Sequence, residues 1–465
     1  MKRHAAFILL SLTFAVPGWA AGLSQRTLAM EPFGTLHLYA EKKHPASVVL
    51  FVSGDGGWNL GVVDMARQMA GLDALVVGID IRHYLHSLGR SAQNCLYPAA
   101  DFESLSKFVQ KSLDFPQYLQ PVLAGYSSGA TLVYASIVQA PPNTFKAALS
   151  LGFCPDLPLG RPPCKGHGLA WEKDAAKSVY LFQPAGHLTT PWVVLQGVAD
   201  QVCNARETRS FVNKVPGAEI IMLPRVGHGF SVPKNWLPQF RKAFLRLSAP
   251  RAVPDQVEFQ NLPLIEVPAD PPADAHLAVI VSGDGGWAGI DRQVSEYLAA
   301  HGVAVVGLNA LKYFWTARTP DGASQDLARV ITAYLKKWRK DQVILIGYSL
   351  GADVLPFMTA RLPTGLGAKI RLLVLLAPGR KTAFEFHLSD WIGAGKAGPQ
   401  YPIGPELDKL GNLPKLCFYG TQEKESLCRD PLPPLTVAVA LHGGHHFGGD
   451  YALIAERILK ALRQP

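Results

Sequence analysis

The chain has 465 residues, of which 48% are hydrophobic and 17% are charged. This composition is typical of a well-packed globular protein and excludes a largely disordered chain. The length exceeds what one hydrophobic core usually organises, so we expect two domains. The formal net charge of +9 favours contact with an anionic surface, although a merely soluble basic protein has the same balance. Without a concentrated Lys/Arg run or a nucleic-acid motif, we expect no nucleic-acid partner and favour anionic phospholipid.

Residues 1–21 have the pattern of a secretory signal peptide. A basic start at residues 1–4 precedes an apolar stretch at residues 5–16, and Gly18 and Ala20 occupy the −3 and −1 positions of a cleavage site before Ala21. A retained membrane anchor is the alternative, but the apolar stretch is short for one. We therefore expect an exported protein that is soluble or peripheral.

The six cysteines are consistent with disulfides formed in an oxidising compartment. Proximity in sequence favours the pairs Cys154–Cys164 and Cys417–Cys428, which would leave Cys95 and Cys203 for each other. Six cysteines allow fifteen pairings, so other connectivities stay open. The chain has no C-x-x-C or tight Cys/His spacing, so we expect no metal site and no cofactor.

A seven-residue string, V-S-G-D-G-G-W, occurs at residues 52–58 and again at residues 281–287. Further matched segments follow in the same order: residues 76–79 with 305–308, 125–130 with 347–352, 195–197 with 418–420, and 226–230 with 443–447. The chain is therefore an internal duplication. We expect two domains, at residues 22–250 and 251–465, with a linker near residues 248–254.

Within each copy, short apolar strands alternate with helical patterns. In the second copy we predict strands at residues 278–281, 304–307, 343–346, 372–376 and 415–419, and helices at residues 291–301, 323–340 and 451–463. This alternation indicates right-handed βαβ units and a mostly parallel sheet with helices on both faces. The predicted fold is thus two tandem α/β-hydrolase-like domains.

The strand predicted at residues 343–346 leads directly into Gly347-Tyr348-Ser349-Leu350-Gly351. A buried strand followed by G-x-S-x-G is typical of the nucleophile elbow of an α/β-hydrolase, in which the serine projects at the carboxyl edge of the sheet. The alternative is an ordinary strand-to-helix turn. We predict that Ser349 is a nucleophile and that Leu350 N–H is one oxyanion donor.

A serine nucleophile needs an acid and a histidine, which follow it in that order in this fold. Counting from the glycine that ends the preceding strand aligns Glu423 with Asp200 of the first copy. Counting back from the nearest cysteine aligns Glu425 instead, and we favour Glu425 because a disulfide would fix that end of the loop. Two solvated loop glutamates are the alternative.

The base is predicted to be His445, which aligns with His228 when the neighbouring glycine and phenylalanine are matched. The first copy also retains Ser127 and Asp200, so a second site built from Ser127, Asp200 and His228 is possible. A histidine that recurs in both repeats at the expected place is unlike an incidental loop histidine.

The S-G-D-G-G-W string follows a strand in each copy, where lipases and esterases place a Gly-rich oxyanion loop. We predict that Gly283 or Asp284 supplies a second N–H donor. A phosphate-binding loop is the rival, but it would need G-K-[ST] or G-x-G-x-x-G. Candidate substrate-binding residues are Tyr348 and the aromatic run Tyr313, Phe314 and Trp315, which forms either an acyl-binding lip or part of the core.

With its duplicated S-G-D-G-G-W, its G-Y-S-L-G-A-D-V-L-P-F and its G-G-H-H-F, the chain resembles the VirJ/AcvB family of bacterial virulence-associated exported proteins. The resemblance covers nearly the whole mature chain, and its strongest motifs lie at residues 282–287, 347–357 and 443–447. Single-unit members of the family are similar to the part from about residue 252 onward.

The resemblance implies a periplasmic α/β-hydrolase and, from some members, hydrolysis of lysyl- or alanyl-phosphatidylglycerol at the aminoacyl ester. Carried over, Ser349 is the nucleophile, His445 the base, and Glu423 or Glu425 the acid. The implied partner is an aminoacylated anionic phospholipid, met by peripheral contact with the periplasmic face of the inner membrane. The alternatives are a general exported lipid esterase or thioesterase, or a non-catalytic factor that binds secretion-system proteins on a hydrolase scaffold.

Overall fold

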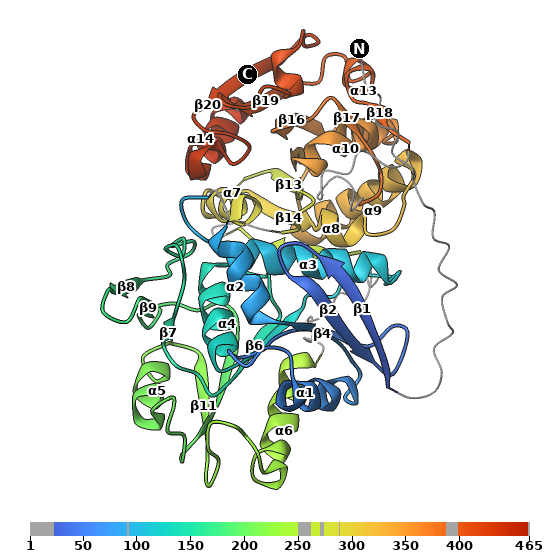
Figure 1. Ribbon diagram of the computed structural model, residues 1–465. Helices are drawn as coiled ribbons and strands as arrows, with labels where there is room; N and C mark the ends of the chain where they lie inside the picture. The colour runs from blue at the N-terminus through green and yellow to red at the C-terminus, as the bar shows by residue number, and fades with distance from the viewer. Residues whose placement is uncertain are drawn as a thin grey trace, which may run out of the picture.

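The computed structural model describes residues 23–90, 93–249, 262–269, 274–287, 289–386 and 399–463. The predicted signal peptide and most of the predicted linker lie outside these ranges. None of the helices within them is both long and apolar enough to cross a bilayer. The described chain folds around two large sheets, one in each copy of the duplication (Figure 1).

The N-terminal domain contains an eight-stranded sheet with the order β1-β2-β4-β3-β5-β6-β10-β11. The strands are β1 (Ser24–Met30), β2 (Gly34–Ala40), β3 (Ser47–Val52), β4 (Ala74–Ile79), β5 (Val122–Tyr126), β6 (Ala147–Leu151), β10 (Trp192–Gly197) and β11 (Ala218–Leu223). The first two strands pair antiparallel, and β2 is antiparallel to β4. All other pairs in this sheet are parallel. A small sheet of β7 (Asp156–Leu157), β8 (Trp171–Asp174) and β9 (Val179–Phe182) is added beside it.

The C-terminal domain repeats this order without the first strand, as β12-β14-β13-β15-β16-β19-β20. Its strands are β12 (Leu264–Val267), β13 (His276–Val281), β14 (Ala304–Leu308), β15 (Gln342–Tyr348), β16 (Ile370–Leu376), β19 (Lys415–Gly420) and β20 (Thr436–Leu441), with a separate pair of β17 (Lys381–Thr382) and β18 (Tyr401–Pro402). Only β12 is antiparallel to its neighbour in the large sheet. The predicted α/β-hydrolase fold, in two tandem copies, is confirmed.

Helices cover both faces of each sheet. In the first domain these are α1 (Leu60–Ala70), α2 (Ile81–Gly89), α3 (Pro98–Ser112), α4 (Ser128–Gln139), α5 (Ala205–Val212) and α6 (Leu237–Ser248). In the second they are α7 (Gly289–Ala300), α8 (Ala310–Tyr313), α9 (Pro320–Trp338), α10 (Leu350–Ala360), α11 (Thr364–Gly367), α13 (Gly404–Asp408) and α14 (Tyr451–Leu462), with short 3₁₀ turns at Pro233–Asn235, Leu427–Arg429 and Phe447–Gly449.

Strand β3 shows why the central parallel strands have unbroken runs of apolar residues. Its side chains alternate between two cores, with Val48 and Leu50 packed in the core shared with α3 and α4, and Val49 and Phe51 in the core shared with α1 and α6. A parallel strand buried on both faces needs apolar residues at every position.

The two domains meet along α3, which lies at the boundary in Figure 1. Trp315 of the C-terminal domain donates its indole N–H to the carbonyl of Phe115 at 2.7 Å and packs against the ring of Tyr118. Lys111 donates to the carbonyl of Trp315 at 2.7 Å and pairs with Glu385 at 2.9 Å. Apolar packing, a buried hydrogen bond and a partly buried ion pair thus join the domains.

The disulfides are Cys95–Cys164, Cys154–Cys203 and Cys417–Cys428. The predicted Cys417–Cys428 pair is therefore right, and the predicted pairs Cys154–Cys164 and Cys95–Cys203 are wrong. Cys154 follows β6 and Cys203 follows β10, which are adjacent parallel strands. The carboxyl ends of adjacent parallel strands lie side by side, so proximity in the sheet outweighed proximity in sequence.

Candidate active sites

Each copy presents a serine at the turn between a central strand and the helix that follows. Ser127 lies between β5 and α4 with φ 55° and ψ −124°, and Ser349 lies between β15 and α10 with φ 52° and ψ −119°. A non-glycine residue at positive φ is strained and is held there only by its surroundings. The two serines therefore share one unusual conformation, which is the conformation of a nucleophile elbow.

The glycines on both sides of each serine are required by close backbone packing. A Cβ atom on Gly347 would lie 2.4 Å from the carbonyl oxygen of Gly351, and one on Gly351 would lie 2.0 Å from that of Val281. In the first copy, Gly125 meets the Gly129 carbonyl oxygen at 2.3 Å in the same way. These contacts, which no side chain fits, explain the G-x-S-x-G pattern.

The N-terminal site is a closed chain of three groups. His228 Nε2 lies 2.9 Å from Ser127 Oγ, and His228 Nδ1 lies 2.9 Å from Asp200 Oδ2. The Asp200 carboxylate is fully buried and also accepts backbone N–H groups of Val202 and Cys203, each at 2.9 Å. These bonds fix the carboxylate so that it holds the imidazole in one orientation.

In the C-terminal site, His445 Nδ1 lies 2.7 Å from Glu423 Oε1, and Glu423 Oε2 accepts the N–H of Gly420 at 2.8 Å. No hydrogen bond joins His445 to Ser349, both of which lie in the described part of the chain. The His445 side chain is 44% exposed, against 17% for His228. This site is the more open of the two, and such contacts often tighten only when substrate binds.

Glu425, the favoured acid, does not reach the histidine. Its side chain is 90% exposed and pairs with Arg380. A Cβ on Gly420 would lie 2.2 Å from the Gly444 carbonyl oxygen, so the end of β19 packs directly against the histidine loop. The number of residues after the end of β19 therefore decides which glutamate faces His445, and that glutamate is Glu423.

The repeated S-G-D-G-G-W loop runs beside each serine. A Cβ on Gly54 would meet Ser127 Cβ at 3.0 Å, and one on Gly283 would meet Ser349 Cβ at 3.3 Å. The Leu350 N–H is the first of α10, and the first four N–H groups of a helix have no intrahelical acceptor. The loop that carries Gly283 and Asp284 thus lies next to the serine and to that N–H, as an oxyanion site requires.

The tryptophan of this loop explains a second repeated feature. A Cβ on Gly307 would lie 2.1 Å from the ring of Trp287, and one on Gly78 would lie 2.1 Å from the ring of Trp58. The ring crosses the neighbouring strand only where that strand has a glycine. The recurring V-V-G segments are therefore partners of the G-G-W segments.

The tyrosine before each serine holds the histidine loop. Tyr126 donates its hydroxyl hydrogen to the carbonyl of His228 at 2.9 Å. Tyr348 Oη lies 2.8 Å from His446 Nδ1 and 3.4 Å from the carbonyl oxygen of His445. Burial raises the pKa of Tyr348, and burial lowers that of His446. Tyr348, which was predicted to bind substrate, thus contacts the loop that carries the candidate base. The repeated G-Y-S was the signal in the sequence for this contact.

The aromatic run does not form a lip. Tyr313, Phe314 and Trp315 are all almost fully buried, with exposures of 1%, 0% and 1%. Tyr313 donates to Asp326 at 2.7 Å, and Trp315 packs against the N-terminal domain. The substrate-binding interpretation of these three residues is wrong, because the segment after β14 is covered by α9 residues and by the other domain.

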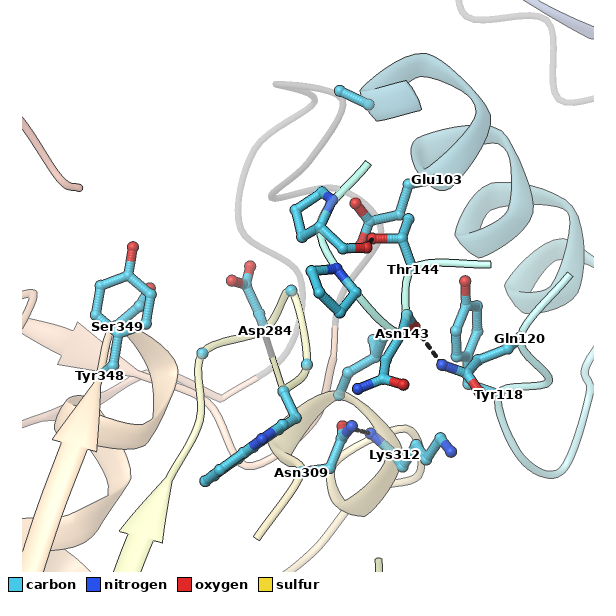
Figure 2. Close-up of a pocket in the computed structure, with 18 of the residues that line it drawn as sticks. Glu103, Tyr118, Gln120, Asn143, Thr144, Asp284, Asn309, Lys312, Tyr348 and Ser349 are labelled. Carbon is cyan, nitrogen blue, oxygen red and sulfur yellow. Dashed lines mark hydrogen bonds between the residues drawn. The ribbon is translucent and has the colours of Figure 1, made fainter. Parts of the chain in front are cut away.

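A pocket of about 340 Å³ opens beside Ser349. Figure 2 shows Ser349 and Tyr348 on one side of it and residues of the N-terminal domain on the other, with Asp284 between them. The residues that the C-terminal domain contributes to the pocket lining also include His445 and His446. The pocket places the candidate nucleophile at the boundary between the domains.

One set of potential metal ligands occurs among the described residues: Asp200, Cys203 and His228, whose ligand atoms lie within 4.8 Å of one another. Cys203 Sγ is bonded to Cys154, so it offers no thiolate. Asp200 already holds His228. This donor set does not fit a metal ion.

A family model described as "Bacterial virulence protein (VirJ)" matches residues 46–152 and 275–465, more than half of the chain. No curated protein sequence matches the chain. Similar solved structures include the α/β serine hydrolase XC6422 from Xanthomonas campestris (18% identity, TM-score 0.33, 51% of this chain and 100% of that one) and a putative dienelactone hydrolase from Klebsiella pneumoniae (15%, 0.36, 50% and 100%). Est1E from Butyrivibrio proteoclasticus is a third (11%, 0.32, 48% and 98%).

Proposed function

The chain belongs to the VirJ family of bacterial virulence proteins, and from this premise we propose that it is an exported serine hydrolase that cleaves the aminoacyl ester of aminoacyl-phosphatidylglycerol. The observation that carries the proposal is the ordered Ser127–His228–Asp200 chain, together with its counterpart of Ser349, His445 and Glu423. A serine on a strained elbow beside a carboxylate-held histidine is the arrangement that acyl transfer needs.

In the proposed reaction, Ser349 Oγ attacks the ester carbonyl carbon while His445 Nε2 accepts the hydroxyl proton. The N–H groups of Leu350 and of Gly283 or Asp284 stabilise the oxyanion. Collapse of the tetrahedral intermediate breaks the bond to the glycerol oxygen, which leaves with the proton from His445. Water then attacks the aminoacyl-enzyme by the same route and releases the amino acid. Ser127 and His228 offer the same chemistry in the first copy.

The setting of this reaction is proposed to be the periplasmic face of the inner membrane. Three disulfides support folding in an oxidising compartment. The net charge of +9 supports peripheral contact with a membrane that phosphatidylglycerol makes anionic. The alternative is a non-catalytic factor that binds secretion-system proteins. The two histidine–carboxylate pairs argue against this alternative.

The test is amino-acid release by the purified full chain from vesicles that contain lysyl- or alanyl-phosphatidylglycerol. We expect release by the parent protein and none by the Ser127→Ala/Ser349→Ala double variant. Cleavage of nitrophenyl esters without cleavage of either lipid would replace this proposal with a general esterase. No turnover of any ester would favour the binding factor.

A further inference from the structure

The pocket beside Ser349 has walls from both domains. The N-terminal domain contributes Glu103 from α3, together with Tyr118, Gln120 and residues 141–144 (Figure 2). We propose that the Ser349 site is a composite of both domains, in which this groove binds the glycerophosphate part of the ester's headgroup and Lys312 contacts its phosphate. The proposal rests on the proposed hydrolase function and names the part of the substrate that the groove recognises.

The N-terminal wall is held in place by its own hydrogen bonds. Gln120 donates its side-chain amide to the carbonyl of Asn143, as the dashed line in Figure 2 shows. Thr144 donates its hydroxyl hydrogen to the carbonyl of Pro141 at 2.9 Å, and Asn143 adopts the left-handed region with φ 68°. Asparagine tolerates this conformation better than most residues. The segment is therefore a fixed turn, which is what a recognition surface requires.

The two walls are also fixed relative to each other. Trp315 lies three residues after Lys312 and is anchored in the N-terminal domain by its bond to Phe115. Leu311, which precedes Lys312, is buried with Trp315 and Tyr118 in a small apolar cluster that spans the domains. The helix that carries Lys312 is thereby clamped against the N-terminal domain.

Lys312 is the cation of this groove. Lys312 is an exposed residue of the pocket lining. Desolvation by the surrounding protein atoms lowers the pKa of Lys312, and no charged group in the described part of the chain contributes to this shift. A partly desolvated ammonium gains from binding an anion. The acidic groups of the pocket are Glu103, which pairs with Lys107 at 2.8 Å, and Asp284 near the serine. Among the described residues that line the pocket, Lys312 is the only lysine or arginine.

The first copy lacks this arrangement. There, the side chain of Arg82 lies against Gly57, where a Cβ would be 2.0 Å from a guanidinium nitrogen, and Arg82 pairs with Asp80 at 3.0 Å. In the second copy, Asn309 caps the short helix in place of Asp80, and Leu311 takes the place of Arg82. The internal ion pair of the first copy is absent there, so the equivalent region of the second copy is free to bind an external anion.

The experiment measures binding of glycerol 3-phosphate, glycerol and inorganic phosphate to the full chain by calorimetry, in the Ser127→Ala/Ser349→Ala background. We expect glycerol 3-phosphate to bind more tightly than glycerol and inorganic phosphate. Lys312→Met should weaken glycerol 3-phosphate binding roughly tenfold or more, the size of a lost charge-assisted hydrogen bond, and Lys312→Arg should retain binding. Lys336→Met, which removes an exposed lysine of α9, is the matched control and should change nothing.

The contribution of the N-terminal domain is tested with Asn143→Gly, which keeps the left-handed backbone and removes the side chain. We expect weaker glycerol 3-phosphate binding by severalfold, with an unchanged unfolding temperature. Equal binding by Lys312→Met and the parent would overturn the proposal, as would inorganic phosphate binding as tightly as glycerol 3-phosphate. If binding depends on Lys312 but the parent protein cleaves neither lysyl- nor alanyl-phosphatidylglycerol, the proposed reaction fails and the subsite stands.

Discussion

His228 Nε2 lies 2.9 Å from Ser127 Oγ, so the N-terminal copy holds a complete Ser-His-Asp chain. In the C-terminal copy Glu423 holds the histidine, and the Ser349 hydroxyl lies in a pocket without a hydrogen bond to the described residues. The two copies thus combine the same parts differently: one is closed and largely buried, and the other is open at a domain boundary. Duplication has kept both sets of parts in place, and we expect both serines to be reactive.

The assignment of the acid predicts opposite outcomes for two neighbouring glutamates. Glu423→Gln should lower kcat for ester hydrolysis at the Ser349 site by roughly 10³-fold or more, because the carboxylate no longer holds the imidazole in the right tautomer. Glu425→Gln removes an exposed partner of Arg380 and should change kcat little. Both are measured in the Ser127→Ala background. Equal losses in the two variants would show that Glu423 is not the acid.

Trp315 is predicted to hold the two domains together. Trp315→Ala should cost about 3–5 kcal/mol of stability, as is usual when a large buried side chain is truncated, and should separate domain unfolding into two transitions in a denaturant titration. Trp338→Ala, which removes a ring that packs against Tyr334 within the C-terminal domain, is the control. Activity at Ser349 should fall with Trp315→Ala, since the groove loses its alignment. A single unfolding transition at the same denaturant concentration as in the parent protein would contradict the role of Trp315 in joining the domains.

The Cys154–Cys203 disulfide is predicted to support the acid of the first site. The Cys203 N–H donates to Asp200 Oδ1 at 2.9 Å, so the bridge anchors the loop that orients His228. Replacing both cysteines with alanine should cost about 2–4 kcal/mol of stability and lower activity at Ser127, measured in the Ser349→Ala background.

The matched control for this bridge is the Cys95→Ala/Cys164→Ala variant, whose disulfide joins the segment before α3 to the segment between β7 and β8. It should lose a similar amount of stability while the Ser127 site keeps its activity. Equal losses of activity in the two disulfide variants would show that the effect is one of general stability.

Much of the fold was readable from the sequence because the duplication supplied two copies of each motif. The five strands predicted in the second copy all occur, with ends within two residues of the prediction. Strands β12 and β20 were missed: β12 is short and partly buried, and most of β20 is accessible to solvent. Their patterns lack the unbroken apolar run of a central parallel strand.

The details that failed were those set by three-dimensional proximity. The disulfide partners depend on which strands are adjacent in the sheet, and the choice of Glu423 over Glu425 depends on how β19 meets the histidine loop. The burial of Trp315 depends on the other domain. None of these relationships can be predicted from the local spacing of residues. The strained serine and its flanking glycines can, because they form a short contiguous motif.

The most direct test of the account is to label the purified protein with a fluorophosphonate and measure its intact mass. A fluorophosphonate reacts with serines activated by a neighbouring base. The account predicts two adducts on the parent protein, one on Ser127→Ala, one on Ser349→Ala, and none on the double variant. Undiminished labelling of the double variant, or no labelling of the folded parent protein, would contradict it.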